Sequence, residues 1–310
     1  LDEIMVGVGG KHIIYNVMMA TLNPNDEVII PAPYWVSYPD IVLLAEGNPV
    51  IVPCDAKQGF KILPNQLESH INDNTKWLML NSPSNPTGAV YSYNELKEIA
   101  EILLKYPKVL ILSDDIYEKI LYDNNKFYTI ATVEPKLKNR TITMNGVSKA
   151  YCMTGWRLGY CGGPKEIILG MNKIQSQSTT STSSISMAAA VEALNGNQDF
   201  ILIHNQHFKK RRDMIVEKLN NIPGIACDIP QGAFYVYPCC SGCIGKKTPS
   251  GKIIKSDEDF MNYLLDSEGI AGVHGKAFGL SPYFRLSYAA DEQTLIDACD
   301  RIMRACIKLK

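Results

Sequence analysis

The stretch TITMNGVSKAYCMTGWRLGY, residues 141–160, carries the feature on which the interpretation of the whole sequence depends. Residues 141–144 are apolar or β-branched and predict a strand, which ends in a turn at Asn145 and Gly146. Lys149 follows this turn, and Arg157 comes eight positions later. A lysine at a strand end, with a fixed cation nearby and few carboxylates around it, can lose its proton and attack an aldehyde. Most lysines are solvated surface groups, so this prediction needs support from the rest of the chain.

The composition predicts an ordinary soluble globular protein. The chain has 310 residues, of which 46% are hydrophobic and 20% charged, and 31 basic against 32 acidic side chains give a net charge of −1. This length suits two domains of unequal size. The sequence contains no basic stripe, no apolar run long enough to cross a bilayer and no secretory signal. We therefore expect neither nucleic acid nor a membrane among its partners.

The nine cysteines favour a reducing compartment, because an odd number of scattered thiols does not suit a disulfide scaffold. We therefore expect a cytoplasmic protein. Cys239, Cys240 and Cys243 invite a zinc or redox role, but no second Cys or His pair stands at a suitable spacing for a structural zinc. We interpret them as incidental thiols of a surface loop. The basic run 209–212 is most simply the solvated face of a helix.

The order of predicted elements favours an α/β fold. Continuous apolar strands between helices indicate a mostly parallel sheet that is covered on both faces. The predicted strands are 27–30, 49–52, 77–80, 109–112 and 141–144, and the predicted helices are 11–22, 35–44, 64–71 and 93–106. Helical periodicity is also expected almost from the first residue.

Beyond residue 184 the pattern changes to that of a smaller α+β domain. We place the larger domain at 1–200 and the smaller one at 201–310. Residues 175–184 form an ordered connector. The predicted elements are helices at 185–194, about 205–220, 258–266 and 292–308 and short strands near 269–273 and 283–288.

Gly9, Gly10 and Lys11 open the first of these helices. Free amides at a helix N-terminus bind anions, and glycines let a phosphate approach closely. The alternative is a tight turn. A nucleotide-hydrolysing P-loop is excluded, because His12 replaces the Ser or Thr of that motif and Met5 stands where its first glycine belongs.

Asp114 and Tyr117 follow a very apolar strand. A carboxylate in such a low-dielectric place needs a cationic partner, which a protonated pyridine nitrogen would provide. Tyr117 can donate a hydrogen bond to a phenolate oxygen on the same ring. The alternative is a helix-capping aspartate beside an ordinary tyrosine.

Asn85 and Trp35 also lie at predicted strand ends. The prolines and glycine of the loop 81–88 fix an irregular shape in which Asn85 presents its amide, although a rigid turn is the alternative. Trp35 can stack on an aromatic ring, although a tryptophan at such a junction is more often core.

Arg285 stands alone inside the apolar strand pattern of residues 284–287. A guanidinium there usually has a carboxylate partner, either within the protein or on a ligand. Its fork geometry suits bidentate binding of an amino-acid α-carboxylate.

Together these motifs resemble the class I aminotransferases of the pyridoxal-phosphate fold type I superfamily, and most of all the bacterial aspartate aminotransferases. The likeness covers essentially the whole chain, and its specificity lies in the order and spacing of the motifs. It implies a mostly parallel seven-stranded sheet flanked by helices and a smaller C-terminal α+β domain. The matching segments are 33–35, 85–88, 114–117, 148–157 and 285–288, with further matches at 232–235 and 275–279.

The resemblance implies that pyridoxal 5'-phosphate is the cofactor and that Lys149 is the catalytic residue, which binds it covalently and later moves the substrate's proton. The other implied cofactor contacts are Asp114 to the ring nitrogen, Asn85 and Tyr117 to the ring oxygen, Trp35 to the ring face, and Gly9, Gly10, Lys11, Ser148 and Arg157 to the phosphate. Arg285 would bind the substrate's α-carboxylate, and Lys11, Trp35 and Asn85 would also contact the substrate.

The resemblance further implies the substrates and the assembly. Lys11 occupies the place of a lysine that binds a second carboxylate in the bacterial aspartate-type branch, which favours aspartate and 2-oxoglutarate. Aromatic or prephenate transamination, a β-lyase and a regulatory domain without turnover remain alternatives. A homodimer with shared active sites is implied, with Ser178 contacting the neighbouring site.

Two features depart from the family pattern. The family's N-terminal segment, which caps the substrate and contributes a tyrosine to the partner's site, has no counterpart here, so the chain resembles a fragment, either inactive alone or the ordered remainder of a longer protein. His274 stands where Pro-Gly commonly begins the segment 275–279, and we expect a local change of loop there.

Overall fold

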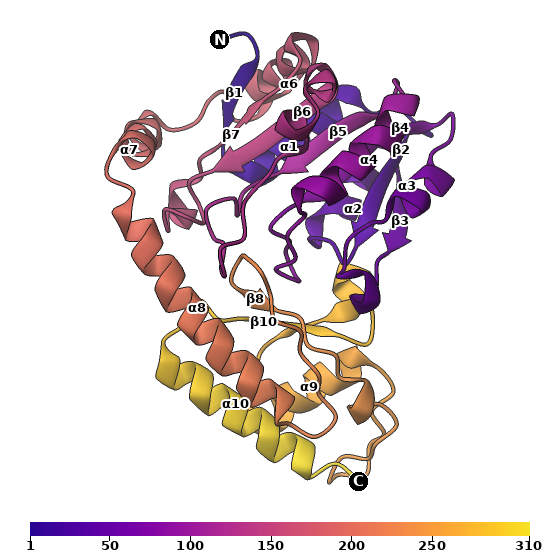
Figure 1. The fold of residues 1–310 in the computed structure, drawn as a ribbon, viewed down its shortest axis with the longest axis vertical. Helices are drawn as coiled ribbons and strands as arrows, with labels where there is room; N and C mark the ends of the chain where they lie inside the picture. The colour runs from indigo at the N-terminus through magenta and orange to yellow at the C-terminus, as the bar shows by residue number, and fades with distance from the viewer.

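The computed structural model describes residues 1–310, and its larger part is built around a seven-stranded sheet (Figure 1). The strand order is β1-β7-β6-β5-β4-β2-β3. Strands β2 to β6 are parallel, whereas β7 is antiparallel to both β6 and β1. The predicted mostly parallel sheet is therefore confirmed. The strands are β1 Ile4–Gly7, β2 Glu27–Ala32, β3 Asn48–Pro53, β4 Thr75–Asn81, β5 Leu110–Asp114, β6 Thr141–Gly146 and β7 Gly159–Gly162.

Helices cover both faces of this sheet, because its central strands are apolar on both sides. One face carries α1 (Gly10–Thr21), α2 (Ser37–Leu44) and α6 (Lys165–Ser178). The other face carries α3 (Pro64–His70), α4 (Tyr93–Lys105) and the short α5 (Ile130–Val133). Several of the polar side chains singled out in the sequence lie at the ends of these strands, where the loops meet.

Helix α4 shows how the sequence specifies such an element. Ser92 and Glu95 form a capping box that satisfies the first backbone amides. Leu96, Ile99 and Leu103 recur at helical spacing and are buried against the sheet.

The C-terminal part begins where α7 (Ser184–Asn195) leads into α8 (Asp199–Asn220), which lies beside α10 (Glu292–Ile307) (Figure 1). Helices α8, α10 and α9 (Asp257–Glu268) pack around a three-stranded antiparallel sheet of order β8-β10-β9. Its strands are β8 Tyr235–Val236, β9 Val273–His274 and β10 Phe284–Ser287. Tyr117 and Tyr122, which follow β5, belong to the same apolar core, so the two parts are packed together. Short 3₁₀ helices lie at Ala56–Gln58, Pro135–Arg140, Thr154–Trp156, Ser241–Cys243 and Gly275–Phe278.

Several local predictions are wrong. The first residues form strand β1 instead of a helix, because they pair with β7, a partner that is distant in the sequence. Strand β6 continues through Gly146, so the turn follows this residue. Helix α8 begins at Asp199 instead of near residue 205, and residues 175–178 belong to α6 instead of a connector. Within the strand expected at 269–273, only Val273 pairs with β10.

Arg212 contradicts the prediction that 209–212 is a solvated helix face. Its side chain is 2% exposed and forms ion pairs with Asp123 and, at 2.6 Å, with Asp213. Nη1 also donates to the Pro230 carbonyl at 3.0 Å. Arg212 therefore fastens α8 to two loops, since a buried guanidinium requires such partners.

The cysteine cluster is also not the expected surface loop. Cys240 and Cys243 are fully buried in the C-terminal core, and Cys239 is half-buried. The Cys243 Sγ lies 4.0 Å from the Sγ of Cys306 on α10, although both thiols are free. These thiols behave as small apolar residues that fill the space beside α10.

None of the helices combines the length and the apolar character that a bilayer crossing requires.

Candidate active site

A cavity of about 380 Å³ opens at the carboxyl ends of β4, β5 and β6. Its volume lies in the range of small-molecule sites. All the predicted site residues except Gly9 and Ser178 line it, namely Gly10, Lys11, Trp35, Asn85, Asp114, Tyr117, Ser148, Lys149, Arg157 and Arg285. Motifs far apart in sequence therefore meet in one place, because parallel strands end at the same edge of a sheet.

Lys149 lies in the turn after β6 and is half-buried. Its Nζ is 5.7 Å from the ring centroids of both Tyr117 and Phe234. Burial, the largest influence, lowers the pKa of Lys149; the Asp114 carboxylate acts in the opposite direction, and the charges of Arg285 and Arg157 lower the pKa further. A lowered pKa raises the fraction of neutral amine, which is the nucleophilic form.

Asp114 ends β5 and is 5% exposed. Its Oδ2 accepts a hydrogen bond from the Tyr38 hydroxyl at 2.6 Å, and its Oδ1 accepts one from the Ile116 amide at 3.3 Å. Burial raises the pKa of Asp114 to about 6, while these hydrogen bonds and the charge of Lys149 oppose the rise. No lysine or arginine pairs with this carboxylate at ion-pair distance. It is therefore a buried acid whose cationic partner has to come from a ligand.

This environment makes the stability of the ligand-free protein depend on pH. Because the folded pKa of Asp114, about 6, lies above the ordinary 3.8, the folded state holds this proton more tightly than the unfolded state. Charging Asp114 therefore destabilises the folded protein. This effect is absent below 3.8, the pKa in the unfolded chain, and complete above about 6, the pKa in the folded protein. We expect Asp114→Asn to raise the free energy of unfolding by about 2–3 kcal/mol at pH 8 and to change it little at pH 4.

Urea denaturation of both proteins at the two pH values measures this difference. An equal effect of the substitution at pH 4 and pH 8 would contradict the raised pKa of Asp114.

The opposite end of the cavity is built to bind an anion. Gly10 and Lys11 begin α1, and the first amides of a helix have no acceptor within it. Gly9 precedes them at a φ of 84°, and a Cβ there would collide with the Arg157 guanidinium. Arg157 donates through Nη1 to the Thr154 carbonyl at 2.8 Å, which fixes the side chain beside the helix terminus. Gly9, which does not itself line the cavity, thus leaves room for the Arg157 guanidinium.

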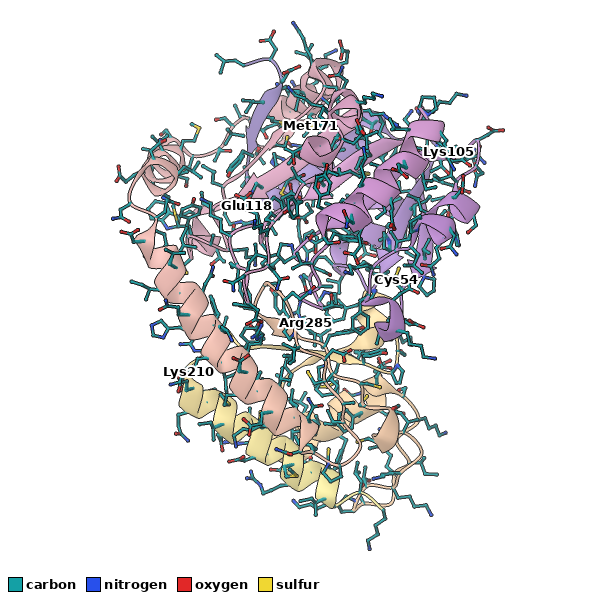
Figure 2. The ribbon with its side chains drawn as sticks, viewed as in Figure 1. Cys54, Lys105, Glu118, Met171, Lys210 and Arg285 are labelled. Atoms are coloured by element: carbon teal, nitrogen blue, oxygen red, sulfur yellow. The ribbon has the colours of Figure 1, made fainter.

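Arg285 reaches the cavity from β10 and lies where the two parts of the molecule meet (Figure 2). Its Nη1 donates to the Asn85 Oδ1 at 2.9 Å. Its guanidinium carbon is 4.6 Å from the ring centroid of Tyr235 and 5.0 Å from that of Phe278. No carboxylate of the chain forms an ion pair with Arg285. The acidic partner expected for it therefore has to be on a ligand.

The remaining predicted residues divide between those inside the cavity and those outside. Trp35 is a half-exposed lining residue rather than core, with the Lys11 Nζ 4.9 Å from its ring centroid. Ser178 is outside the cavity, and its hydroxyl bonds to the carbonyl of Ile174 in its own helix at 3.0 Å. His274 accepts a hydrogen bond from the Ala277 amide at 3.3 Å and so caps the turn that follows it.

Two tyrosines of the site had no role in the sequence analysis. Tyr38 donates to Asp114, and Tyr235 lies against Arg285, with its hydroxyl oxygen 3.0 Å from that of Tyr117. Tyr38 stands three residues after Trp35, on the same side of a helical turn. This spacing is the one feature of the sequence from which its place in the site could have been inferred.

The sequence matches the family model for aminotransferases of class I and II over residues 2–302. It is 55% identical to an aspartate aminotransferase of Rhizobium meliloti over 309 residues, which are 100% of this chain and 75% of the relative. It is 54% identical to an aspartate/prephenate aminotransferase of Cereibacter sphaeroides over 307 residues, 99% of this chain and 77% of that protein.

Solved structures agree with these matches. The crystal structure of the aspartate aminotransferase from Rhizobium meliloti superposes with a TM-score of 0.98 at 54% identity, covering 100% of this chain and 77% of that one. The Thermus thermophilus aspartate aminotransferase with maleate gives a TM-score of 0.90 at 37% identity, covering 98% and 76%. The chain belongs to the class I and II aminotransferase family.

Proposed function

We propose that this aminotransferase uses pyridoxal 5'-phosphate and transfers an amino group between aspartate and 2-oxoglutarate. One observation carries the proposal. Asp114, a buried carboxylate without a cationic partner in the chain, lines the same cavity as the reactive amine of Lys149. A protonated pyridine that is tethered through an aldehyde satisfies both groups at once.

The rest of the cavity supports this cofactor. We assign Asp114 to the ring nitrogen and the Asn85 amide to the ring oxygen, because the Asn85 Oδ1 is already occupied by Arg285 and its NH₂ remains to donate. Tyr117 would be the second donor to that oxygen, and Trp35 would contact the face of the ring. The phosphate belongs at the anion-binding end, with Ser148, Arg157, and the amides of Gly10 and Lys11 above Gly9.

Bound pyridoxal phosphate supplies an electron-withdrawing ring that accepts the electron pair left when the substrate's α-carbon loses its proton. Asp114 keeps the ring nitrogen protonated through its negative charge. Lys149 accepts the α-proton at Nζ, for which the lowered pKa of this amine prepares it. Two successive half-reactions at one site then give a ping-pong mechanism, in which the first product, an oxo acid, leaves before the second substrate binds.

The charges of the cavity support a dicarboxylate substrate. We assign the substrate's α-carboxylate to Arg285, which has no acidic partner in the chain. Lys11 lines the same cavity, its Nζ lies over the Trp35 ring and it forms no ion pair in the chain, so its charge is available to a second carboxylate. The names of the relatives, aspartate and aspartate/prephenate aminotransferase, agree with such a substrate.

We expect Lys11→Met to raise the KM for aspartate by about 10- to 100-fold, because the variant loses one charge-assisted contact with the substrate. Transamination of an aromatic amino acid, which lacks the second carboxylate, should change much less. Steady-state kinetics with both amino acids measures the difference. Lys108→Met, which removes an exposed lysine before β5, is the control and should behave as the wild type. An equal loss for both substrates would argue against this role for Lys11.

Mixing the protein and pyridoxal phosphate with aspartate and 2-oxoglutarate tests the proposed function. Formation of oxaloacetate and glutamate supports it. Turnover of prephenate or of an aromatic amino acid in place of aspartate would indicate the related transaminase specificity, and pyruvate formation without an acceptor acid would indicate a β-lyase. Failure of aspartate to convert the bound cofactor to its amine form would indicate a domain without turnover.

The assembly belongs to the same proposal. We infer a homodimer with shared active sites, which is supported by exposed apolar side chains along α7 and the start of α8, including Ile185, Val191 and Leu202. Ser178 is proposed to contact the neighbouring site. The domain division at 200/201 and the cytoplasmic location stay predictions.

A further inference from the structure

Tyr235 touches two of the groups that the proposed function requires. It comes from β8 in the three-stranded sheet and is 6% exposed. Its hydroxyl oxygen is 3.0 Å from that of Tyr117, which follows β5 of the seven-stranded sheet. Its ring centroid is 4.6 Å from the guanidinium carbon of Arg285 on the neighbouring strand β10. One side chain thus joins the donor to the cofactor with the group that binds the carboxylate.

Either hydroxyl can donate in the contact between Tyr117 and Tyr235, but Tyr235 becomes the donor when Tyr117 donates its own proton to a ligand. A phenol has one proton, so if Tyr117 donates to a ligand oxygen, its own oxygen can accept a proton from Tyr235. Successive hydrogen bonds in a chain polarise one another, so Tyr235 strengthens Tyr117 as a donor. The buried position of both hydroxyls keeps water from replacing this interaction.

The contact between the ring and Arg285 is independent of the hydroxyl. Arg285 has a single hydrogen bond to a side chain, that to Asn85, and otherwise faces the rings of Tyr235 and Phe278. A ring at this distance attracts a guanidinium through its quadrupole and limits the positions that the guanidinium adopts. Removal of the ring therefore loosens the group that binds the substrate.

We propose that Tyr235 is a positioning residue, which orients Tyr117 through its hydroxyl and Arg285 through its ring. The inference rests on the proposed function, because it concerns the cofactor and the dicarboxylate assigned to this cavity. The two contacts are separable: Tyr235→Phe removes only the hydroxyl, and Tyr235→Met removes the ring but fills a similar volume.

The hydroxyl is tested by a pH titration of the visible absorbance of the cofactor-loaded protein. A weaker hydrogen bond from Tyr117 would stabilise the negative charge of the cofactor's ring oxygen less. This oxygen would then hold the proton that it shares with the Lys149 nitrogen more tightly, so the proton would be lost at a higher pH. Tyr235→Phe should therefore raise the pKa of this titration by about 0.3 to 1 unit. Tyr237→Phe, which removes a hydroxyl bonded to the Leu280 carbonyl at 2.8 Å, is the matched control and should leave the pKa unchanged.

The ring is tested by the dissociation constant of succinate, a dicarboxylate that cannot react. Tyr235→Met should weaken its binding by about three- to tenfold, whereas Tyr235→Phe should stay within about twofold of the wild type. A titration of Tyr235→Phe identical to the wild type overturns the role of the hydroxyl, and this variant keeps the packing. Wild-type succinate affinity in Tyr235→Met overturns the role of the ring.

These results are distinguishable from a failure of the proposed function. If the wild-type protein itself acquires no visible absorbance with pyridoxal phosphate, the cofactor assignment is wrong. If the wild type binds cofactor and succinate and the Tyr235 variants do the same without change, only the inference about Tyr235 is wrong.

Discussion

Lys149→Ala should lower kcat for aspartate transamination by about 10⁴-fold, because the variant loses both the covalent attachment and the base that moves the α-proton. The variant should still fold, since the Lys149 side chain forms no hydrogen bond or ion pair in the chain and its Nζ lies over the rings of Tyr117 and Phe234. Steady-state assays at saturating cofactor, with the thermal midpoint of unfolding measured in parallel, separate a chemical effect from a loss of structure.

Lys119→Ala is the matched control for this substitution. Lys119 is also half-buried and lies over an aromatic ring, with its Nζ 5.5 Å from the Tyr151 centroid, but it does not line the cavity. Its replacement should change kcat by about twofold or less. If Lys149→Ala kept activity close to that of the control, the role assigned to Lys149 would be wrong.

Asp114→Asn should lower kcat by about 10²- to 10³-fold while the protein still binds the cofactor. The amide is similar in shape and can still accept a hydrogen bond from Tyr38, but it lacks the charge that stabilises a proton on the ring nitrogen. The same variant is expected to be more stable than the wild type without ligand at pH 8. Lower activity together with higher stability is characteristic of a buried charge that is retained for function.

Asp115→Asn provides the control for Asp114→Asn. Asp115 is equally buried, and its pKa is raised by burial to about 7, but its Oδ1 accepts a hydrogen bond from Ser113 at 2.7 Å outside the cavity. We expect kcat to change by about threefold or less. Comparable losses in both variants would show that burial of charge, and not the position of Asp114 in the cavity, determines the effect.

The sequence predicted most of the sheet and ten of the sixteen residues that line the cavity, and the two successes have one physical cause. Long apolar strands buried on both faces are recognisable from their composition, and in a parallel sheet their carboxyl ends must converge. Asp114 ends one such strand and Lys149 follows the neighbouring one, so their approach follows from the topology alone.

Features that depend on tertiary pairing were not predictable in the same way. Strands β1 and β7 are short, and they form because β7 pairs with both β1 and β6. Arg212 is buried because α8 packs against the loops that carry Asp123 and Pro230. Tyr235 enters the site only because β8 pairs with the strand that carries Arg285. The residues that neighbour these positions in the sequence do not show which distant segments they will contact.

Borohydride reduction of the protein with bound pyridoxal phosphate, followed by peptide mass spectrometry, shows directly whether Lys149 is the residue that binds the cofactor covalently. We predict one stable pyridoxyl group per chain, attached to the peptide that contains Lys149. A label on another lysine with Lys149 unmodified, or no label at all, would contradict it.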